Sequence, residues 1–446
     1  MGDPNQLKNN IKVLIFPWLA HGHITPLLEL AKKLTQRNFH IYFCSTPVNL
    51  DSIKPKIVSD PKFSNSIQLV ELHLPSLPEL PPHHHTTKGL PPHLLPTLHR
   101  ALRMTEPNLA NILDTLKPDF AIHDIFPGFV PDLTSSLNIP SFVFINTGAN
   151  FISCLIHRGK KKQDHEYPYP QIFPDDMDTK ISTMLEITSA NYEAISQYYD
   201  RCGNIVLIKS FEELEGKYID YLSALLGKKI VMTGILVPDP SSDDEEGMDI
   251  INWLDKKEKA STVFVSFGSE CYLSKEDLEE VAHGLELSKV NFIWVIRFPE
   301  GEKLKLEDAL PNGFLGKVKE KGLVVENWAP QMKILKHSSI GGFVSHCGWG
   351  SLTESIKFGV PVIATPIQYE QPWNARLIEE CGIGLEVERN SKGGLPRENI
   401  AKIIKQVVIE KTGEDIRRKA KVMSDNVKRK GDREIDEVVK ELLQIL

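Results

Sequence analysis

Two histidines stand two positions apart in the stretch FPWLAHGHITPLLEL, residues 16–30. His21 and His23 follow an apolar run and precede apolar residues at helical spacing. A neutral imidazole has a reference pKa of about 6.5 and can accept a proton as a general base. The N-terminus of a helix disfavours the cationic form and keeps a histidine ready for that task. Each histidine could equally be a surface or packing residue, and residue type alone does not choose between them.

A second candidate lies in GGFVSHCGWGSLTES, residues 341–355. The pattern is typical of a short strand, a turn with Gly348 and Gly350, and a helix. Glycines let a ligand approach the backbone, and a helix start offers unpaired N–H groups and the positive end of the dipole. This predicts a phosphate site, to which His346 adds a donor and Ser351 a hydroxyl. The alternative is an ordinary strand-to-helix turn with a hydrogen-bonded histidine.

Another turn, SFGSE at residues 266–270, could bring Ser269 and backbone N–H groups to the same phosphates. Neither turn matches the G-x-G-x-x-G of dinucleotide sites or the G-x-x-x-x-G-K-[ST] of P-loops. The G-x-S-x-G elbow of α/β-hydrolases is also absent from the sequence. These three enzyme classes therefore lose support.

The elements that would position these residues alternate between strand and helix. Helices are expected at 26–36, with Thr25 as cap and Pro26 in first position, and at 274–289, with Ser274 as cap. Strands are expected at 11–16, 40–46, 67–72, 119–124 and 141–146, and again at 262–267, 291–297, 322–327, 341–345 and 361–366. This rhythm predicts an α/β fold with two Rossmann-like, doubly wound domains that face each other across a cleft.

The expected boundaries follow from composition. Residues 1–236 form the first domain, the Pro-, Ser- and acid-rich stretch 237–250 a linker, and residues 251–430 the second domain. Residues 431–446 form a helix that packs back on the first domain. Its apolar side chains recur at helical spacing and need a surface to cover: Ile435, Val438, Val439, Leu442 and Leu443.

Charge and cysteine content limit the binding partners and the cellular compartment that we expect. Net charge is −7, from 52 basic and 59 acidic residues, so a nucleic-acid partner is not expected. Six scattered cysteines indicate reduced thiols. The start MGDPNQLKNN lacks a signal pattern, and no stretch approaches the roughly 18 apolar residues of a membrane span. We therefore expect a cytoplasmic protein with no membrane span.

Two short motifs could suggest a metal. DMD at 176–178 matches a metal-binding D-x-D pattern, and HHH at 83–85 consists of potential ligands. Both lie in Pro-rich loops, and three adjacent histidines do not easily converge on one ion. We interpret both as loop residues and expect no metal site.

A longer stretch carries a family resemblance. From Trp328 to Gln371 the chain reads WAPQMKILKHSSIGGFVSHCGWGSLTESIKFGVPVIATPIQYEQ. This resembles the 44-residue donor-binding signature of plant family 1 UDP-sugar glycosyltransferases, enzymes of the GT-B fold. The resemblance extends over essentially the whole chain, because FGS, the GHITP turn and the two-domain rhythm also stand where that family has them.

The resemblance implies a donor site in which Trp328 stacks on uracil. It also implies further contacts, which reach the base, the ribose, the phosphates and the sugar: Ala329, Gln331, His346, Trp349, Ser351, Glu354, Glu370, Gln371 and, from the first half, Thr147. The terminal Gln371 together with Glu370 favours UDP-glucose. One position departs from the family, which usually has Asn where this chain has Gly350.

The resemblance also separates the two histidines. It makes His23, three residues before Pro26, the general base, with Asp124 as the carboxylate that orients it and stabilises the imidazolium. The implied reaction is inverting, needs no metal or cofactor, and uses UDP-glucose as co-substrate. The enzyme is expected to act as a monomer on a small molecule.

The stretch 70–94 resembles the branch that lengthens sugar chains, so we expect a plant glycoside as acceptor and a β-1,6 rather than a β-1,2 linkage. The first alternative is direct O-glucosylation of a flavonoid or terpenoid aglycone. The second is a non-catalytic protein that binds nucleotide sugars.

Overall fold

The computed structural model describes residues 11–160, 162, 164–188, 191–240, 246–269, 271–298 and 305–445. Three parts of the sequence that carry predictions lie outside the described residues: the N-terminal stretch used to predict the cellular compartment, residues 241–245 of the expected linker, and Glu270. The chain divides into two compact units. Unit 1 comprises Met1–Pro168, Leu185–Leu236 and Gly431–Leu446, and unit 2 comprises Tyr169–Met184 and Val237–Lys430.

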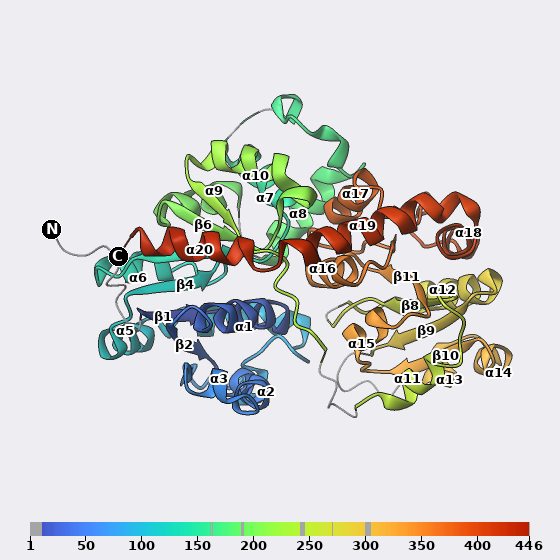
Figure 1. Ribbon diagram of the computed structural model, residues 1–446, viewed down its shortest axis with the longest axis horizontal. Coiled ribbons are helices and arrows are strands. Elements are labelled where there is room, and N and C mark those ends of the chain that lie inside the picture. Colours follow the sequence, from blue (N-terminus) through green and yellow to red (C-terminus); the bar gives the residue numbers. More distant parts are fainter. Residues whose placement is uncertain are drawn as a thin grey trace. The chain divides into compact units, whose positions relative to one another are not determined.

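Unit 1 is built on a seven-stranded parallel sheet with helices on both faces (Figure 1). The strand order is β3-β2-β1-β4-β5-β6-β7. The strands are β1 Ile11–Phe16, β2 Phe39–Ser45, β3 Ile67–Glu71, β4 Phe120–Asp124, β5 Ser141–Ile145, β6 Ile205–Ile208 and β7 Lys229–Met232. The α-helices are α1 His21–Thr35, α2 Pro47–Val58, α3 Pro61–Ser64, α4 Leu95–Arg103, α5 Glu106–Leu116, α6 Val130–Ser136, α7 Ala149–Gly159, α9 Tyr192–Arg201, α10 Glu212–Leu226 and α20 Arg433–Leu443. Three short 3₁₀ helices are η1 Pro82–His84, η2 Pro92–Leu94 and η3 Asp164–Glu166.

Unit 2 has a six-stranded parallel sheet of order β10-β9-β8-β11-β12-β13. Its strands are β8 Thr262–Ser266, β9 Asn291–Ile296, β10 Gly322–Glu326, β11 Ile340–Ser345, β12 Val362–Ala364 and β13 Gly384–Glu386. Its helices are η4 Pro170–Ile172, α11 Met248–Leu254, α12 Lys275–Ser288, α13 Leu306–Ala309, α14 Phe314–Val318, α15 Gln331–Lys336, α16 Trp349–Phe358, α17 Gln371–Glu380, α18 Arg397–Val408, η5 Lys411–Gly413 and α19 Glu414–Lys430. Helix α8, Met177–Thr188, crosses the boundary between the units.

The central strands are apolar because both of their faces are covered. In β1, Val13 and Ile15 pack into the core on one face of the sheet, whereas Leu14 and Phe16 pack into the core on the other. A strand buried on both sides appears as a continuous apolar run, which is why these segments could be recognised in the sequence. Strands β6, β7 and β13 were not among those expected.

Helix α1 begins earlier than expected. Its N-cap is Ala20, so His21 is its first residue, and Thr25 and Pro26 lie inside the helix. The predicted cap at Thr25 was therefore wrong. For α12 the prediction was right, because the Ser274 hydroxyl accepts from the Asp277 backbone N–H at 3.1 Å.

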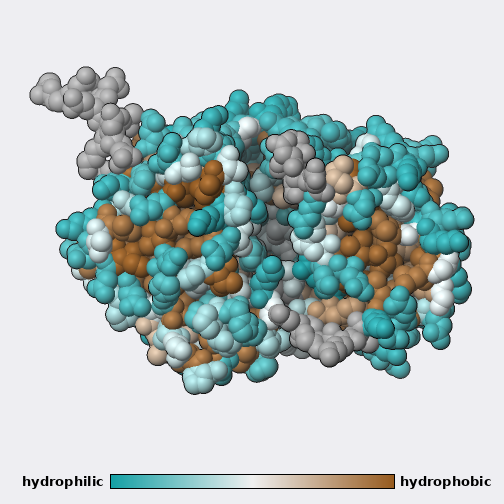
Figure 2. Space-filling view, turned by 90° about the horizontal axis from the view of Figure 1, so that it is seen from below, coloured by the Kyte–Doolittle hydropathy of each residue, from teal (hydrophilic) through white to brown (hydrophobic). Residues whose placement is uncertain are grey.

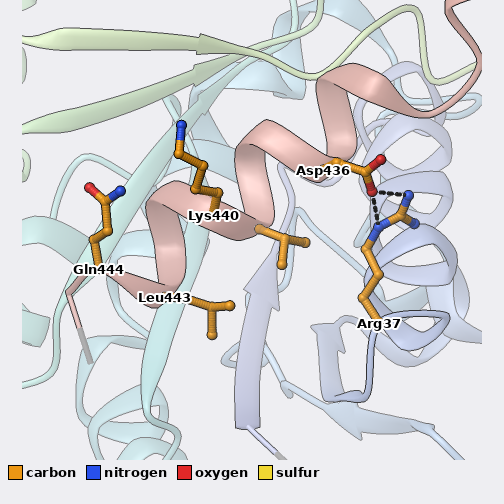
Figure 3. A pocket seen from close by; sticks show the side chains of 6 residues that line it. Arg37, Asp436, Lys440, Leu443 and Gln444 are labelled. Carbon is orange, nitrogen blue, oxygen red and sulfur yellow. Dashed lines mark hydrogen bonds and ion pairs between the residues drawn. The ribbon is translucent and has the colours of Figure 1, made fainter. Parts of the chain in front are cut away.

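Helix α20 packs within unit 1 rather than with the residues that precede it. Three of the five apolar side chains, Ile435, Val438 and Leu442, are buried in the core with α1, and the other two pack against it. Ion pairs flank this contact, among them Lys33–Asp432 at 2.7 Å and Arg37–Asp436 at 2.6 Å. Figure 3 shows Arg37, just past the C-terminal end of α1, reaching to Asp436 on α20.

The segment Tyr169–Met184 groups with unit 2, although its sequence position suggested the first domain. Ile172 is fully buried, and η4 contacts α17. The Gln171 amide also donates to Glu380 at 2.9 Å. Together with an ion pair between Asp175 and Arg376 of α17 at 3.6 Å, these contacts link the segment to α17.

Polar and apolar residues are mixed on the face of the molecule in Figure 2. Over the part of the chain that the structure describes, no helix has both the length and the apolar character needed to cross a membrane.

Candidate active site

The first group of polar residues lies at the carboxyl edge of the unit 1 sheet. Strands β1 and β4 are parallel neighbours, and the strand order reverses between them. Open α/β sheets bind ligands at such a point. His23 is the third residue of α1, which follows β1, and Asp124 is the last residue of β4. The fold therefore brings together two side chains that are 101 positions apart.

His23 Nδ1 lies 2.7 Å from Asp124 Oδ2. The Asp124 carboxylate is fully buried, whereas the His23 side chain is 22% exposed. Donation of the Nδ1 proton to the carboxylate selects the tautomer in which Nε2 accepts protons. The carboxylate also stabilises the imidazolium that forms when Nε2 gains a proton. This pair can therefore act as a general base.

His21 has different surroundings. Burial, and then the positive charges of Lys88 and Lys56, lower the pKa of His21. At 3.6 residues per turn, the two positions between His21 and His23 correspond to a rotation of about 200°, so their side chains point to nearly opposite sides of the helix. The carboxylate of Asp124 pairs with His23.

Thr147 lies just past the end of β5, the neighbour of β4. Its hydroxyl oxygen is buried and has no hydrogen-bond partner within the described part of the chain. Beside it, the Asn146 amide donates to the Gly22 carbonyl at 2.7 Å. Sequence reasoning missed Asn146, and the only local signal was Pro26, whose missing N–H leaves that carbonyl without its i+4 donor.

The second group lies at the carboxyl edge of the unit 2 sheet, where the strand order reverses between β8 and β11. After β11, Cys347 takes a positive φ of 67°, Gly348 serves as N-cap, and α16 begins at Trp349. The first turn of a helix points its N–H groups away from the helix and carries a partial positive charge. This edge of unit 2 is suited to bind a phosphate.

The ring of His346 lies against two glycines of this edge. A Cβ added to Gly268 would come within 2.7 Å of the ring, and one added to Gly348 within 2.6 Å. Burial lowers the pKa of His346 to about 4, and its Nδ1 has no hydrogen-bond partner among the described residues. His346 is therefore neutral near pH 7 and can donate one N–H to an anion.

Three residues expected to bind different parts of the UDP-sugar, Gln331, Ser351 and Glu354, come together between α15 and α16. The Gln331 amide donates to Glu354 at 2.7 Å and to the Ser351 hydroxyl at 3.3 Å. Trp328, which follows β10, is 45% exposed, an unusual state for so large an apolar ring. Ala329 next to it is buried. An exposed flat ring such as that of Trp328 can stack on a base, and a carboxylate such as that of Glu354 can accept from ribose hydroxyls.

The residues expected to contact the sugar differ in what they offer. Gln371 is 4% exposed, and its side-chain oxygen accepts from the backbone N–H groups of Ile367 and Gln368 at 2.9 and 3.0 Å. One N–H of its Nε2 donates to Cys271 Sγ at 3.7 Å, so only the other N–H remains for a sugar hydroxyl. Glu370 is the partly exposed N-cap of α17, and Ser269 is exposed after β8.

Gly350 lies in open space, since a Cβ added there would meet nothing within 4 Å. The structure thus leaves room for the asparagine side chain that this position lacks.

The two metal-like motifs have other partners. Asp176 pairs with Lys180 at 2.7 Å, and His85 is buried with its Nε2 3.3 Å from the Leu80 carbonyl. His83 and His84 lie in η1. Across the described ranges, no group of three His, Cys, Asp or Glu side chains could hold a metal ion.

Two family models match consecutive parts of the chain. Residues 9–238 match the model described as "Glycosyltransferase, N-terminal domain", and residues 239–433 match "UDP-glucoronosyl and UDP-glucosyl transferase". The chain belongs to this family of UDP-glycosyltransferases. The fold that the sequence predicted, with two parallel α/β domains of the GT-B type, is confirmed.

The glycosyltransferase is similar to enzymes named for extending glycosides. It is 51% identical to a mogroside IIIx synthase from Siraitia grosvenorii over 452 residues, covering 100% of this chain and 95% of that protein. It is 49% identical to the β-D-glucosyl crocetin β-1,6-glucosyltransferase of Gardenia jasminoides, covering 97% and 98%. A crystal structure of Glycyrrhiza uralensis UGT73P12, complexed with glycyrrhetinic acid 3-O-monoglucuronide, matches with a TM-score of 0.84 and 25% identity over 98% of this chain and 96% of that one.

Proposed function

We propose that this glycosyltransferase moves glucose from UDP-glucose to a hydroxyl of a sugar already attached to a plant secondary metabolite. The observation that carries the catalytic part is the 2.7 Å contact between His23 and Asp124. Support for the sugar acceptor comes from the names of relatives about half identical to this chain. The enzyme would act as a monomer in the cytoplasm.

His23 Nε2 takes the proton of the acceptor hydroxyl, and the acceptor oxygen attacks the anomeric carbon of the donor. The bond from that carbon to the UDP oxygen breaks, and its electron pair leaves with UDP. Attack from the face opposite the leaving group turns the α-linked donor into a β-glycoside. Asp124 stabilises the imidazolium until the proton is passed to solvent.

The leaving diphosphate gains negative charge as the bond breaks. The N–H groups at the start of α16, the helix dipole and the neutral His346 would offset this charge. These groups are fixed before the reaction, so they need not reorganise while the charge develops. In this proposal no metal and no cofactor takes part.

Glucose is proposed as the donor sugar on the basis of Glu370 and Gln371. A carboxylate and an amide can distinguish the orientation of adjacent hydroxyls, because a mismatched hydroxyl leaves a buried polar group unpaired. With the Gln371 oxygen bound to backbone, discrimination would come from its Nε2 and from Glu370. Rates with UDP-glucose, UDP-galactose and UDP-xylose at equal concentration test this, and a preference for either of the last two would overturn it.

The acceptor assignment is tested with matched pairs of aglycone and monoglucoside. Each pair is incubated with UDP-glucose, and the linkage of the product is determined by NMR. We expect faster conversion of the glucosides and a β-1,6 linkage. Faster conversion of the free aglycones would support direct O-glucosylation instead, and would leave the proposed base and donor site intact.

A further inference from the structure

The backbone around His23 has an irregularity that proline creates. In α1 the first helical bond runs from the Ile24 N–H to the Ala20 carbonyl at 2.9 Å. Two residues later, position 26 would donate to the Gly22 carbonyl, but Pro26 has no N–H. The ring of a proline inside a helix also presses on the carbonyl four residues before it. The carbonyl directly before His23 in the chain therefore lacks the i+4 donor of a regular α-helix.

Asn146 supplies the missing donor. Its Nδ2 lies 2.7 Å from the Gly22 oxygen, across 124 positions of sequence. Because a carbonyl can only accept, the orientation of this amide is fixed by the contact. The other end of the amide, Oδ1, is buried and has no hydrogen-bond partner in the described structure. A buried polar atom without a partner costs about 1–3 kcal/mol, so stability alone does not explain an asparagine here.

The segment that carries Asn146 is anchored on its far side. It leads into α7, where the Asn150 backbone N–H donates to Glu215 at 2.8 Å. The second oxygen of Glu215 accepts from the Ser210 hydroxyl at 2.7 Å. Glu215 is fully buried. Asn146 thus reaches the His23 turn from backbone held at β5 and at α7.

We propose that Asn146 is a positioning residue for the base: by holding the Gly22 carbonyl it fixes the turn that aims the His23 imidazole. This inference rests on the proposed role of His23. Asn146 is assigned no contact with substrate. A base that loses its alignment by about 1 Å can lose about 100-fold in rate, so one hydrogen bond at the backbone of the base has a measurable effect.

The first test removes the donor. Asn146→Ala deletes the amide, and Asn146→Asp keeps its size but replaces the donating group with an acceptor. Each should lower kcat about 10- to 100-fold, while KM for UDP-glucose, whose predicted binding residues lie mainly in unit 2, changes less than about twofold. The matched control is Asn399→Ala, since Asn399 also donates its Nδ2 to a backbone carbonyl, that of Glu388 at 2.9 Å. It should leave kcat unchanged.

The decisive test restores the bond by another route. Pro26→Ala places an N–H at position 26, which can donate to the Gly22 carbonyl inside the helix. The double variant Asn146→Ala/Pro26→Ala should therefore recover at least about fivefold of the activity that Asn146→Ala loses, a non-additive result typical of two residues that share one partner. Melting temperature and UDP binding are measured for each variant to confirm folding.

Two outcomes would overturn the inference. One is wild-type kcat in Asn146→Asp, and the other is additive losses in the folded double variant. His23→Ala separates this inference from the proposed function. If His23→Ala remains active, the assigned base is wrong, whereas an inactive His23→Ala together with a fully active Asn146→Asp removes only the role of Asn146.

Discussion

The two units place a histidine at the same kind of point and give it opposite surroundings. In unit 1, His23 follows β1 and meets the carboxylate that ends β4. In unit 2, His346 follows β11 and lies between the backbones of Gly268 and Gly348. Both strand pairs flank the position where the strand order of their sheet reverses. The shared topology provides the location, and the neighbours determine the chemistry.

The difference lies in whether a positive charge can be accommodated. His23 is partly exposed and has a buried carboxylate at 2.7 Å, so a proton on its ring is stabilised. Burial lowers the pKa of His346 to about 4, and the cause is desolvation with no carboxylate to offset it. The first histidine is thus suited to accept a proton, and the second is suited to stay neutral and donate a hydrogen bond.

The largest effect is expected when the histidine of unit 1, His23, is removed. His23→Ala should lower the rate of glucose transfer by about 100-fold or more, because the general base is lost. Affinity for UDP should stay nearly unchanged, since unit 2 is intact. Steady-state kinetics and calorimetric titration with UDP measure the two quantities. His21→Ala is the control, and turnover that survives in His23→Ala but not in His21→Ala would reverse the assignment.

The next largest effect is expected when the histidine of unit 2, His346, is displaced. Gly268→Ala puts a Cβ within 2.7 Å of the His346 ring and should displace it. UDP affinity should fall by about tenfold, which corresponds to about 1.4 kcal/mol. Gly313→Ala is a matched control, because Gly313 also has a positive φ, of 74°, but its Cβ would meet nothing. Equal losses in both variants would show that backbone strain, rather than the histidine, is responsible.

A third prediction extends the comparison to Glu215, a buried carboxyl group that has no cation beside it in the described structure. Burial raises the pKa of Glu215 to about 7. A carboxyl group whose pKa is raised on folding contributes most stability below its unfolded pKa, near 4.5, and loses that contribution as pH rises towards 7. Glu215→Gln removes the ionisation, so its melting temperature relative to wild type should be higher by a few degrees at pH 8.5 than at pH 5. Scanning calorimetry at both pH values measures this difference, and a difference independent of pH would contradict it.

The smallest expected effect is a gain. Gly350→Asn adds a donor to the first turn of α16, where the structure leaves space. One added hydrogen bond of about 1 kcal/mol should lower KM for UDP-glucose by about three- to fivefold. Gly316→Asn, on α14 and also in open space, should leave KM unchanged. An increase in KM for Gly350→Asn would mean that the glycine itself is needed at the anion site.

Much of the fold could be predicted because strands covered on both faces appear as apolar runs. The predicted strand 262–267 differs by one residue from β8, Thr262–Ser266. Strand β13, Gly384–Glu386, has three residues and no such run, so nothing in the sequence marked it. The start of α1 was missed because Pro26 usually opens a helix. Here Pro26 is tolerated at the sixth position of the helix. The Asn146 side chain donates to the Gly22 carbonyl in place of the missing N–H.

The site was less predictable than the fold. Periodicity gave no reason to pair His23 with Asp124, and the pairing came from the family resemblance. The geometry then showed what the resemblance could not, namely that the Gln371 oxygen is already bound to backbone. It also revealed Asn146, whose partner is a backbone atom, so that Pro26 was the one local sign of this contact in the sequence.

Helix α20 has a consequence for synthesis of the chain. Its residues Ile435, Val438 and Leu442 complete the unit 1 core, yet all of Val237–Lys430 is translated before them. At 5 to 20 residues per second, the apolar face beside α1 stays uncovered on the ribosome for roughly 10 to 40 s after the last strand of its sheet is made. During that interval a nascent unit 1 exposes a surface to which chaperones, or other nascent chains, can bind.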